Sequence, residues 1–308
     1  MKDSFVHIGI INYPGAMQTA IHGFTEMFTL ANGIAADAGV NKRIRLTLID
    51  VDPLPTPHKL QVLIIPPVME KQQYLDVDPS IRQWIIKQHA KGTTLCSSCA
   101  GTFVIASTGL LDQRPATTHW DLAHQFHQSF PDIRLDIDKL LVNDGDIITA
   151  GGLMSWIDLG LELVAQFIQP SVMRHLGQYM VVDTGLREQR YYQRFNPVLD
   201  HGDKTIVKAQ HFIHKHFDQS ISIESLCSLC CLTERTFLRH FVKATTLKPT
   251  QYIQQIRIRK ACELIESSTS TFETIAAIVG YEDSSAFRKT FVKIIGLTPR
   301  EFKQRFVS

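Results

Sequence analysis

Cys99 and His119 are residue types that together can perform nucleophilic chemistry. Cys99 lies in the stretch TTLCSSCAGTFVIASTGLL, two residues before Gly101, where a β-branched run gives way to a helical apolar pattern. Such a strand-to-helix turn places a side chain at a helix N-terminus, where the helix dipole lowers the pKa of a thiol and favours the thiolate. His119 would then act as a base or ion-pair partner, while backbone N–H groups after Cys99 would hold an oxyanion.

The other cysteines suggest two further kinds of chemistry. Cys96 and Cys99 have the CxxC spacing of a redox pair, but Cys96 falls inside a predicted strand, which favours a core position. Cys227, Cys230 and Cys231 suggest a zinc site, but no second His or Cys pair follows at ligand spacing. Positions 227 and 230 share the apolar face of a helix, so we predict packing there, no metal and no cofactor.

The elements that would position Cys99 alternate between strand and helix. Short, continuously apolar strands separated by helical patterns are typical of a parallel sheet covered on both faces. A hairpin with its turn at 143–145 is expected within 139–152, and two helical patterns follow to about residue 182. The predicted strands are 5–11, 44–50, 60–65 and 93–97, and the first helices are 17–33 and 79–91.

Charge divides the 308 residues into two parts. Residues 1–185 contain 13 Lys+Arg and 18 Asp+Glu, a net charge of −5, whereas residues 186–308 contain 19 and 12, a net charge of +7. A basic carboxy-terminal third suggests a polyanionic partner for that part alone. The first fifteen residues do not resemble a signal peptide, no apolar run is long enough for a membrane span, and the cysteine spacing fits a reducing cytoplasm.

The periodicity predicts a domain at 1–185, a linker at 186–203, where arginines, aromatics, Gly and Pro mix, and a helical domain at 204–308. The helical domain contains an internal repeat. FVKATTLKPTQYIQQ (241–255) aligns without gaps with FVKIIGLTPREFKQR (291–305) at a spacing of 50. Upstream, 226–241 matches 275–291 with one extra residue in the second copy.

Each copy of the repeat predicts a helix, a tight turn and a second helix. Gly280 would end the first helix of the second copy, and Asp283 or Glu282 would cap the next. In the first copy Thr233 is the expected N-cap. This is the helix-turn-helix arrangement, whose second helix enters the major groove of DNA. The residues expected to face the DNA are Arg235, Thr236, Leu238 and Arg239 in the first copy, and Ser284, Ser285, Arg288 and Lys289 in the second.

The carboxy-terminal hundred residues resemble the AraC-type DNA-binding domain, from ISIESLCSLCCLTERTFLRHF to the closing TPREFKQRF. The resemblance implies that a long helix, about 249–266, holds two recognition helices one DNA turn apart. Cys231 stands where the first turn of that family usually has Gly, so a non-glycine residue must tolerate the turn. Leu238 stands at an outward position that is usually polar, and we interpret it as a thymine-methyl contact or a weak contact.

Residues 5–182 resemble the PfpI-like branch of the class I glutamine-amidotransferase-like superfamily, which precedes an AraC-type domain in regulators called GlxA-type. The matching segments include SSCAGTFVIASTGLLDQRPATTHW and ITAGGLMSWIDLGLELV. The resemblance implies a flavodoxin-like α/β sandwich with Cys99 at an elbow and His119 nearby. In enzymatic relatives an acidic residue on the first helix supports the cysteine; by alignment on Gly23, Ala20 stands at that position here, and Glu26 matches a different position.

The sequence therefore predicts a transcription factor and not an enzyme. The amino-terminal domain would bind a small effector, an amino acid or quaternary amine by family resemblance, in a pocket that includes Cys99, His119, Trp120 and Trp156. Trp156 would fill part of that pocket, present a ring to a cation, or belong to the core. The predicted partners are double-stranded DNA, a second copy of the chain and RNA polymerase, with no membrane, in a bacterial cytoplasm at the nucleoid. The alternatives are a cysteine-dependent hydratase or amidase fused to a DNA-binding domain, and a thiol oxidation sensor.

Overall fold

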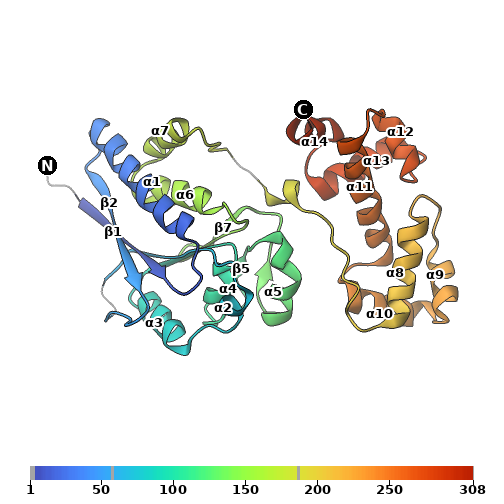
Figure 1. Ribbon diagram of the computed structural model, residues 1–308, viewed down its shortest axis with the longest axis horizontal. Helices are drawn as coiled ribbons and strands as arrows, with labels where there is room; N and C mark the ends of the chain where they lie inside the picture. Colours follow the sequence, from blue (N-terminus) through green and yellow to red (C-terminus); the bar gives the residue numbers. More distant parts are fainter. Residues whose placement is uncertain (1–3, 57–58, 186–187, 308) are drawn as a thin grey trace. The chain divides into compact units, whose positions relative to one another are not determined.

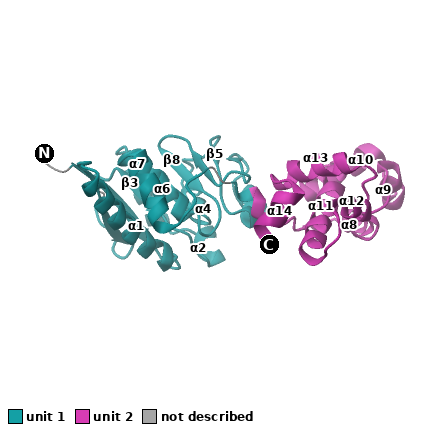
Figure 2. Ribbon diagram, turned by 90° about the horizontal axis from the view of Figure 1, so that it is seen from above, with its two compact units in different colours: residues 1–189 teal, residues 190–308 magenta. Residues whose placement is uncertain are grey.

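The computed structural model describes residues 4–56, 59–185 and 188–307, and they form two units, residues 1–189 and 190–308. Figure 1 labels their elements, and Figure 2 colours the two units separately. Within the described ranges, no helix is both long enough and apolar enough to cross a bilayer.

Unit 1 is built around a six-stranded sheet in the order β2-β1-β3-β4-β8-β7. All neighbouring pairs are parallel except β7 and β8, which form the predicted hairpin. The four strands expected from the sequence are all present. The strands are β1 (Ser4–Asn12), β2 (Lys42–Asp50), β3 (Val62–Ile65), β4 (Thr94–Ser98), β7 (Leu141–Asn143) and β8 (Ile147–Ala150), and a small separate sheet joins β5 (Pro115–Ala116) to β6 (Arg134–Leu135).

Helices cover this sheet on two sides, as the continuously apolar strands require (Figure 1). On one side α1 (Gln18–Asp37), α6 (Trp156–Phe167) and α7 (Pro170–Met180) pack together. On the other lie α2 (Lys71–Leu75), α3 (Pro79–His89), α4 (Gly101–Ala106) and α5 (Ala123–Ser129). The predicted α/β sandwich is therefore confirmed.

Helices α1 and α6 approach each other closely because each presents a glycine to a large side chain of the other. A Cβ on Gly23 would overlap the indole of Trp156, and one on Gly160 would overlap the Met27 sulfur. Trp156 is buried against Phe24, with ring centroids 5.5 Å apart. This layer fixes where the amino terminus of α6 lies above the sheet.

Unit 2 is helical and has two separate hydrophobic cores. Helix α11 belongs to both, because Tyr252 and Ile256 lie in the first core while Ile258 and Ile265 lie in the second. The helices are α8 (Lys204–His216), α9 (Ile223–Cys230), α10 (Glu234–Thr245), α11 (Pro249–Ser267), α12 (Phe272–Ile278), α13 (Ser284–Ile295) and α14 (Pro299–Phe306).

The segment expected to be a linker, 186–203, includes residues 186 and 187, which lie outside the described residues. Its remaining part begins with Glu188, which forms an isolated β-bridge with Lys139, and continues into the short 3-10 helix η2 (Gln189–Tyr192); from residue 190 onward it belongs to unit 2. Phe195 contacts the ring of Tyr252, and the guanidinium of Arg305 lies over Tyr191 and Tyr192. The mixture of arginines and aromatics in this segment therefore makes specific contacts.

Candidate DNA interface and effector site

The first helix-turn-helix unit is α9, a turn at Cys231 and α10. Cys231 adopts the left-handed conformation with φ 54°, so the non-glycine residue does occupy the turn that the family usually gives to Gly. The N–H of Leu232 donates to the Cys227 carbonyl and closes the end of α9. Thr233 holds the N-cap position of α10, where its hydroxyl donates to the hydroxyl of Thr236 and not to the helix backbone.

The second unit, α12 to α13, repeats this geometry with Gly280 in the turn at φ 85°. Asp283, and not Glu282, caps α13, because its carboxylate accepts from the backbone N–H groups of Ser285 and Ala286. These bonds hold the pKa of the Asp283 carboxyl below its usual value, so the cap remains charged at neutral pH. Both units therefore present their second helix after a left-handed turn, and the second helix of the second unit has a side-chain cap.

The outward faces of α10 and α13 carry most of the residues predicted to meet DNA. Arg235 and Arg239 are exposed on α10, with Thr236 half-buried beside them. Leu238 is half-buried and packs against the first core, so it lies at the edge of the apolar face. The exposed residues on α13 are Ser284, Ser285, Arg288 and Lys289.

Helix α11 and Arg257 fix the two helix-turn-helix units to each other within unit 2. The 19 residues of α11 span about 28 Å at the usual helical rise, somewhat less than the ~34 Å of one DNA turn. Arg257 of α11 donates to the carbonyls of Phe217, Gln219 and Gly280, at 2.7–2.8 Å, and its guanidinium lies over the ring of Tyr281. This arginine joins the end of α8 to the turn of the second unit.

In unit 1, Cys99 occupies the predicted elbow between β4 and α4. Its backbone is left-handed, with φ 53°, and its N–H donates to the Ala150 carbonyl at 2.8 Å. Gly101 is needed there because a Cβ would lie 2.6 Å from the carbonyl oxygen of Ile65 and 2.7 Å from that of Pro66. The elbow is thus held against β3 and β8 by backbone contacts.

The predicted acidification of the Cys99 thiol is wrong. The side chain is only 5% exposed, and burial raises the pKa of the thiol to about 11, although the Ala100 N–H acts in the opposite direction. The free energy that a thiolate loses on leaving water exceeds the stabilisation that the short helix α4 and one backbone N–H provide. At neutral pH Cys99 is therefore a neutral thiol, which does not suit a cysteine nucleophile.

His119 and Trp120 come shortly after strand β5, in a segment that is hydrogen-bonded to the Cys99 elbow. The hydroxyl of Thr118 donates to the Cys99 carbonyl at 2.8 Å, and the His119 and Trp120 rings lie 5.3 Å apart. The His119 Nδ1 atom accepts the N–H of Asp121, and burial lowers the pKa of the imidazole, so the neutral ring carries its proton on Nε2. Within the residues that the structure describes, no hydrogen bond or ion pair joins this ring to the Cys99 thiol.

The other positions around the elbow support neither acid catalysis nor a simple pocket that includes all four predicted residues. Ala20 is fully buried on α1 and Glu26 is exposed. Trp156 begins α6 and packs on α1, as the core interpretation predicted, and among the described residues no ring contact or hydrogen bond connects it with Cys99, His119 or Trp120. Its buried Nε1 atom has no hydrogen-bond partner within the same residues.

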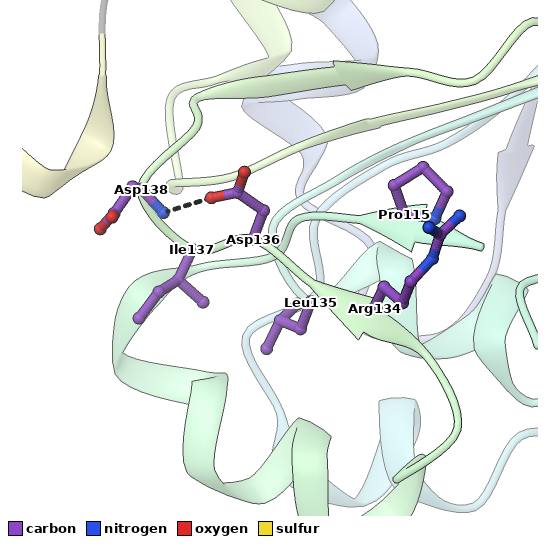
Figure 3. Close-up of a pocket in the computed structure, with 6 residues that line it drawn as sticks. All are labelled: Pro115, Arg134, Leu135, Asp136, Ile137 and Asp138. Atoms are coloured by element: carbon purple, nitrogen blue, oxygen red, sulfur yellow. Dashed lines mark hydrogen bonds between the residues drawn. The ribbon is translucent and has the colours of Figure 1, made fainter. Parts of the chain in front are cut away.

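Figure 3 shows a hollow of about 430 Å³ elsewhere on unit 1, on the strands β5 and β6. Its lining mixes apolar side chains with charges of both signs, and the Asp136 carboxylate accepts the backbone N–H of Asp138. None of the four predicted effector residues lines this hollow. The lining residues are Pro115, Arg134, Leu135, Asp136, Ile137 and Asp138.

Three residues that matter to these sites did not stand out in the sequence. Thr118 was part of a matched family segment but carried no assigned role, Gln189 lay in the expected linker, and Arg257 lay in a helix rich in basic residues. A buried amide or a carbonyl-binding arginine has no spacing signature of its own. Cys227 and Cys230, by contrast, lie in the first core of unit 2, as their apolar helix face predicted.

Each of the two units matches a known protein family. The "Helix-turn-helix domain" family matches residues 226–305, and the "DJ-1/PfpI family" matches residues 34–166. The HTH-type transcriptional regulator CdhR of Pseudomonas aeruginosa is 26% identical over 227 residues, which are 73% of this chain and 67% of that protein. The matched region thus spans about two thirds of the length of this curated relative.

Two further relatives concern unit 1. A crystal structure of a Vibrio parahaemolyticus protein described as a transcriptional regulator has a TM-score of 0.50 at 23% identity, covering 57% of this chain and all of that one, and it supports the fold. The isonitrile hydratase of Pseudomonas putida is 31% identical over 116 residues, 35% of this chain and 46% of the enzyme. The chain therefore combines a DJ-1/PfpI-family domain with an AraC-type helix-turn-helix domain.

Proposed function

We propose that this protein is a DNA-binding transcriptional regulator that inserts α10 and α13 into successive major grooves of one duplex. The observation that carries the proposal is that helix α11 joins two helix-turn-helix units. Each unit presents exposed basic side chains on its second helix. Arg235 and Arg239 suit bidentate contacts to guanine edges, whereas Ser285 and Lys289 suit phosphate oxygens.

Unit 1 would supply the response to a small metabolite bound beside the Cys99 elbow. A neutral thiol, a neutral imidazole with Nε2–H and the adjacent Trp120 ring offer polar contacts and ring faces without a reactive anion. Ring faces attract quaternary ammonium groups and other organic cations, which supports an amino-acid or quaternary-amine effector. The effector would act by stabilising one conformation of the protein over another.

The remaining parts of the proposal concern assembly and setting. A homodimer would present four recognition helices to repeated half-sites, and RNA polymerase is the expected partner at a promoter. The protein would act at the bacterial nucleoid in the cytoplasm. The residues proposed for DNA contact are Arg235, Thr236, Arg239, Ser284, Ser285, Arg288 and Lys289, with Leu238 reassigned to the core edge.

The DNA-binding part is tested by Arg239→Ala, measured with a duplex that the wild-type protein selects from a random library. Loss of a bidentate base contact should weaken binding about 5- to 150-fold at moderate salt, equivalent to ~1–3 kcal/mol. Lys215→Ala is the matched control, because Lys215 is an exposed basic residue on α8. Equal affinity for the Arg239→Ala and wild-type proteins would refute the assignment of α10.

The hydratase similarity makes an enzyme the second candidate, and Cys99→Ser separates it from the sensor. A regulator with a neutral Cys99 should keep its DNA response to a panel of amino acids and quaternary ammonium compounds after this substitution, and should also ignore peroxide. Parallel loss of that response and of a measurable hydration or amidase turnover would favour the enzyme. Loss of a peroxide response alone would favour the thiol oxidation sensor.

A further inference from the structure

Gln189, the last residue of unit 1, is buried at the point where the chain leaves that unit. Its side chain is 2% exposed, and its backbone N–H donates to the Asp138 carbonyl at 3.0 Å. A glutamine in a connecting segment ordinarily lies in solvent, because burial of an amide is unfavourable unless it is hydrogen-bonded. The contacts of this side chain therefore need an explanation.

The amide group of Gln189 is enclosed by a built socket. Its Nε2 atom donates to the Thr117 hydroxyl at 2.9 Å, to the Thr118 carbonyl at 2.8 Å and, at 3.2 Å, to the carbonyl of Lys139. Gly151 provides the space, because a Cβ there would overlap Nε2 and would lie 2.7 Å from the Gln189 Cδ atom. Three acceptors converge on one donor group, which is specific for an amide or amine and excludes a carboxylate.

The same socket is continuous with the proposed effector site. Thr118 binds the Cys99 carbonyl through its hydroxyl and Gln189 through its own carbonyl. The Thr117 carbonyl accepts from Thr102, which lies in the first turn of α4 after the elbow. His119 and Trp120 are the next two residues along the chain, so a ligand that moves them displaces the atoms that hold Gln189.

The residues directly after Gln189 are held equally firmly, within unit 2. A Cβ on Gly296 would overlap the Arg190 side chain and would lie 2.7 Å from the ring of Tyr191. The hydroxyl of Tyr192 accepts from Arg305 at 3.1 Å. Gln189 is thus held within unit 1, and the three residues that follow it are held within unit 2.

We propose that Gln189 is a latch whose engagement with Thr117 and Thr118 is set by the occupant of the Cys99–His119 site and in turn controls DNA binding. The proposal rests on the proposed function, since it requires an effector at that site. The latch has two states: Gln189 seated in its socket, or released together with the start of η2. A ligand that favours one state shifts the population of both.

The first test asks whether the socket depends on the amide. Gln189→Met keeps the length of the side chain and removes both N–H donors, and Gln178→Met on the exposed face of α7 is its control. In the full chain, Gln189→Met should increase deuterium exchange in peptides that cover 117–120 and 188–192, while Gln178→Met should not. Unchanged exchange at 117–120 would overturn the latch.

The second test asks whether the latch carries information to DNA. His119→Ala, as a perturbation of the effector site, should change the Kd for the selected duplex about fivefold or more in the otherwise wild-type protein. In the Gln189→Met background the same substitution should change it less than about twofold. A purely structural role of Gln189 would lower stability but leave the effect of His119→Ala on the Kd unchanged in the Gln189→Met background.

The outcomes separate the two proposals. An equal effect of His119→Ala in both backgrounds refutes the latch and leaves the effector site standing. No effect in either background refutes the coupling of that site to DNA, and the latch with it. If Gln189→Met unfolds unit 1, Gln189→Ala replaces it in both tests, because the smaller side chain lets water reach the same acceptors.

Discussion

The two helix-turn-helix units have the same backbone geometry at the turn. They differ in the residue at the turn and in the chemistry of the outer face. Cys231 and Gly280 both adopt the left-handed conformation, so the turn geometry is common to both units. At 280 a Cβ would lie 2.5 Å from the Asp218 carbonyl oxygen, whereas the Cys231 side chain is exposed. The motif requires the conformation, and the local surroundings decide whether only glycine can supply it.

The outer faces differ in a way that suggests a division of work. Helix α10 presents two arginines four residues apart, and α13 presents two serines followed by an arginine and a lysine. Arginine reads guanine edges through a fixed fork, whereas serine and lysine mostly bind phosphate. We therefore expect the first unit to contribute more to sequence discrimination and the second more to salt-dependent affinity.

The largest effect is expected from Gly280→Ala. Left-handed strain together with the overlap at Asp218 should destabilise unit 2 by about 2–4 kcal/mol in urea unfolding followed by circular dichroism. Gly202→Ala is the matched control, since Gly202 has φ 81° with no atom near its missing Cβ, and it should cost only ~1–2 kcal/mol. Equal losses would mean that the Asp218 contact does not constrain the turn.

Arg257→Met should come next, because it removes three charge-assisted bonds to carbonyls that join α8 to the second turn. We expect a loss of about 2–3 kcal/mol in the free energy of unfolding of unit 2, by the same measurement. Lys260→Met removes only a surface pair with Glu263 and should cost less than about 0.5 kcal/mol. A loss as small as that of the control would show that Arg257 does not join α8 to the turn of the second helix-turn-helix unit.

The difference between the outer faces is tested by Lys289→Ala beside Arg239→Ala. Lys289→Ala should weaken binding about equally for all sequences and should reduce the slope of log K against log salt by roughly one. Arg239→Ala should instead relax the preference at one base position. Titrations of matched and mismatched duplexes over a salt series measure both. The same pattern for both variants would remove the proposed division of work.

The smallest effect is expected from Cys231→Gly. Glycine adopts φ 54° without a Cβ clash, so the first unit should gain about 0.5–1 kcal/mol after the entropy of glycine is subtracted. A shift in the urea midpoint of unit 2 without a change in slope measures this gain. Destabilisation would show that the Cys231 side chain contributes to the turn.

Sequence periodicity predicted the strands, the hairpin and both helix-turn-helix units, because each depends on local pattern and turn residues. It also placed Cys99 at its elbow. It did not predict the pKa of Cys99, since the balance between burial and a helix dipole depends on how completely the folded chain buries the thiol. The outward pattern of α10 also did not show that Leu238 packs partly against the first core.

Gln189 shows a different kind of limit. Its burial results from acceptors at 117, 118 and 139 and from the space at Gly151, which are far from it in sequence. Loss of helical and strand periodicity is expected both in a flexible segment and in one whose residues make specific contacts. Only the three-dimensional arrangement distinguishes them.

The central claim, that both second helices enter successive major grooves of one duplex, is tested most directly by methylation interference at guanine N7 on the selected duplex. We expect two clusters of interference about 10 base pairs apart, with the cluster at the first helix-turn-helix unit lost in Arg239→Ala. A single cluster, or two clusters that both persist in Arg239→Ala, would contradict it.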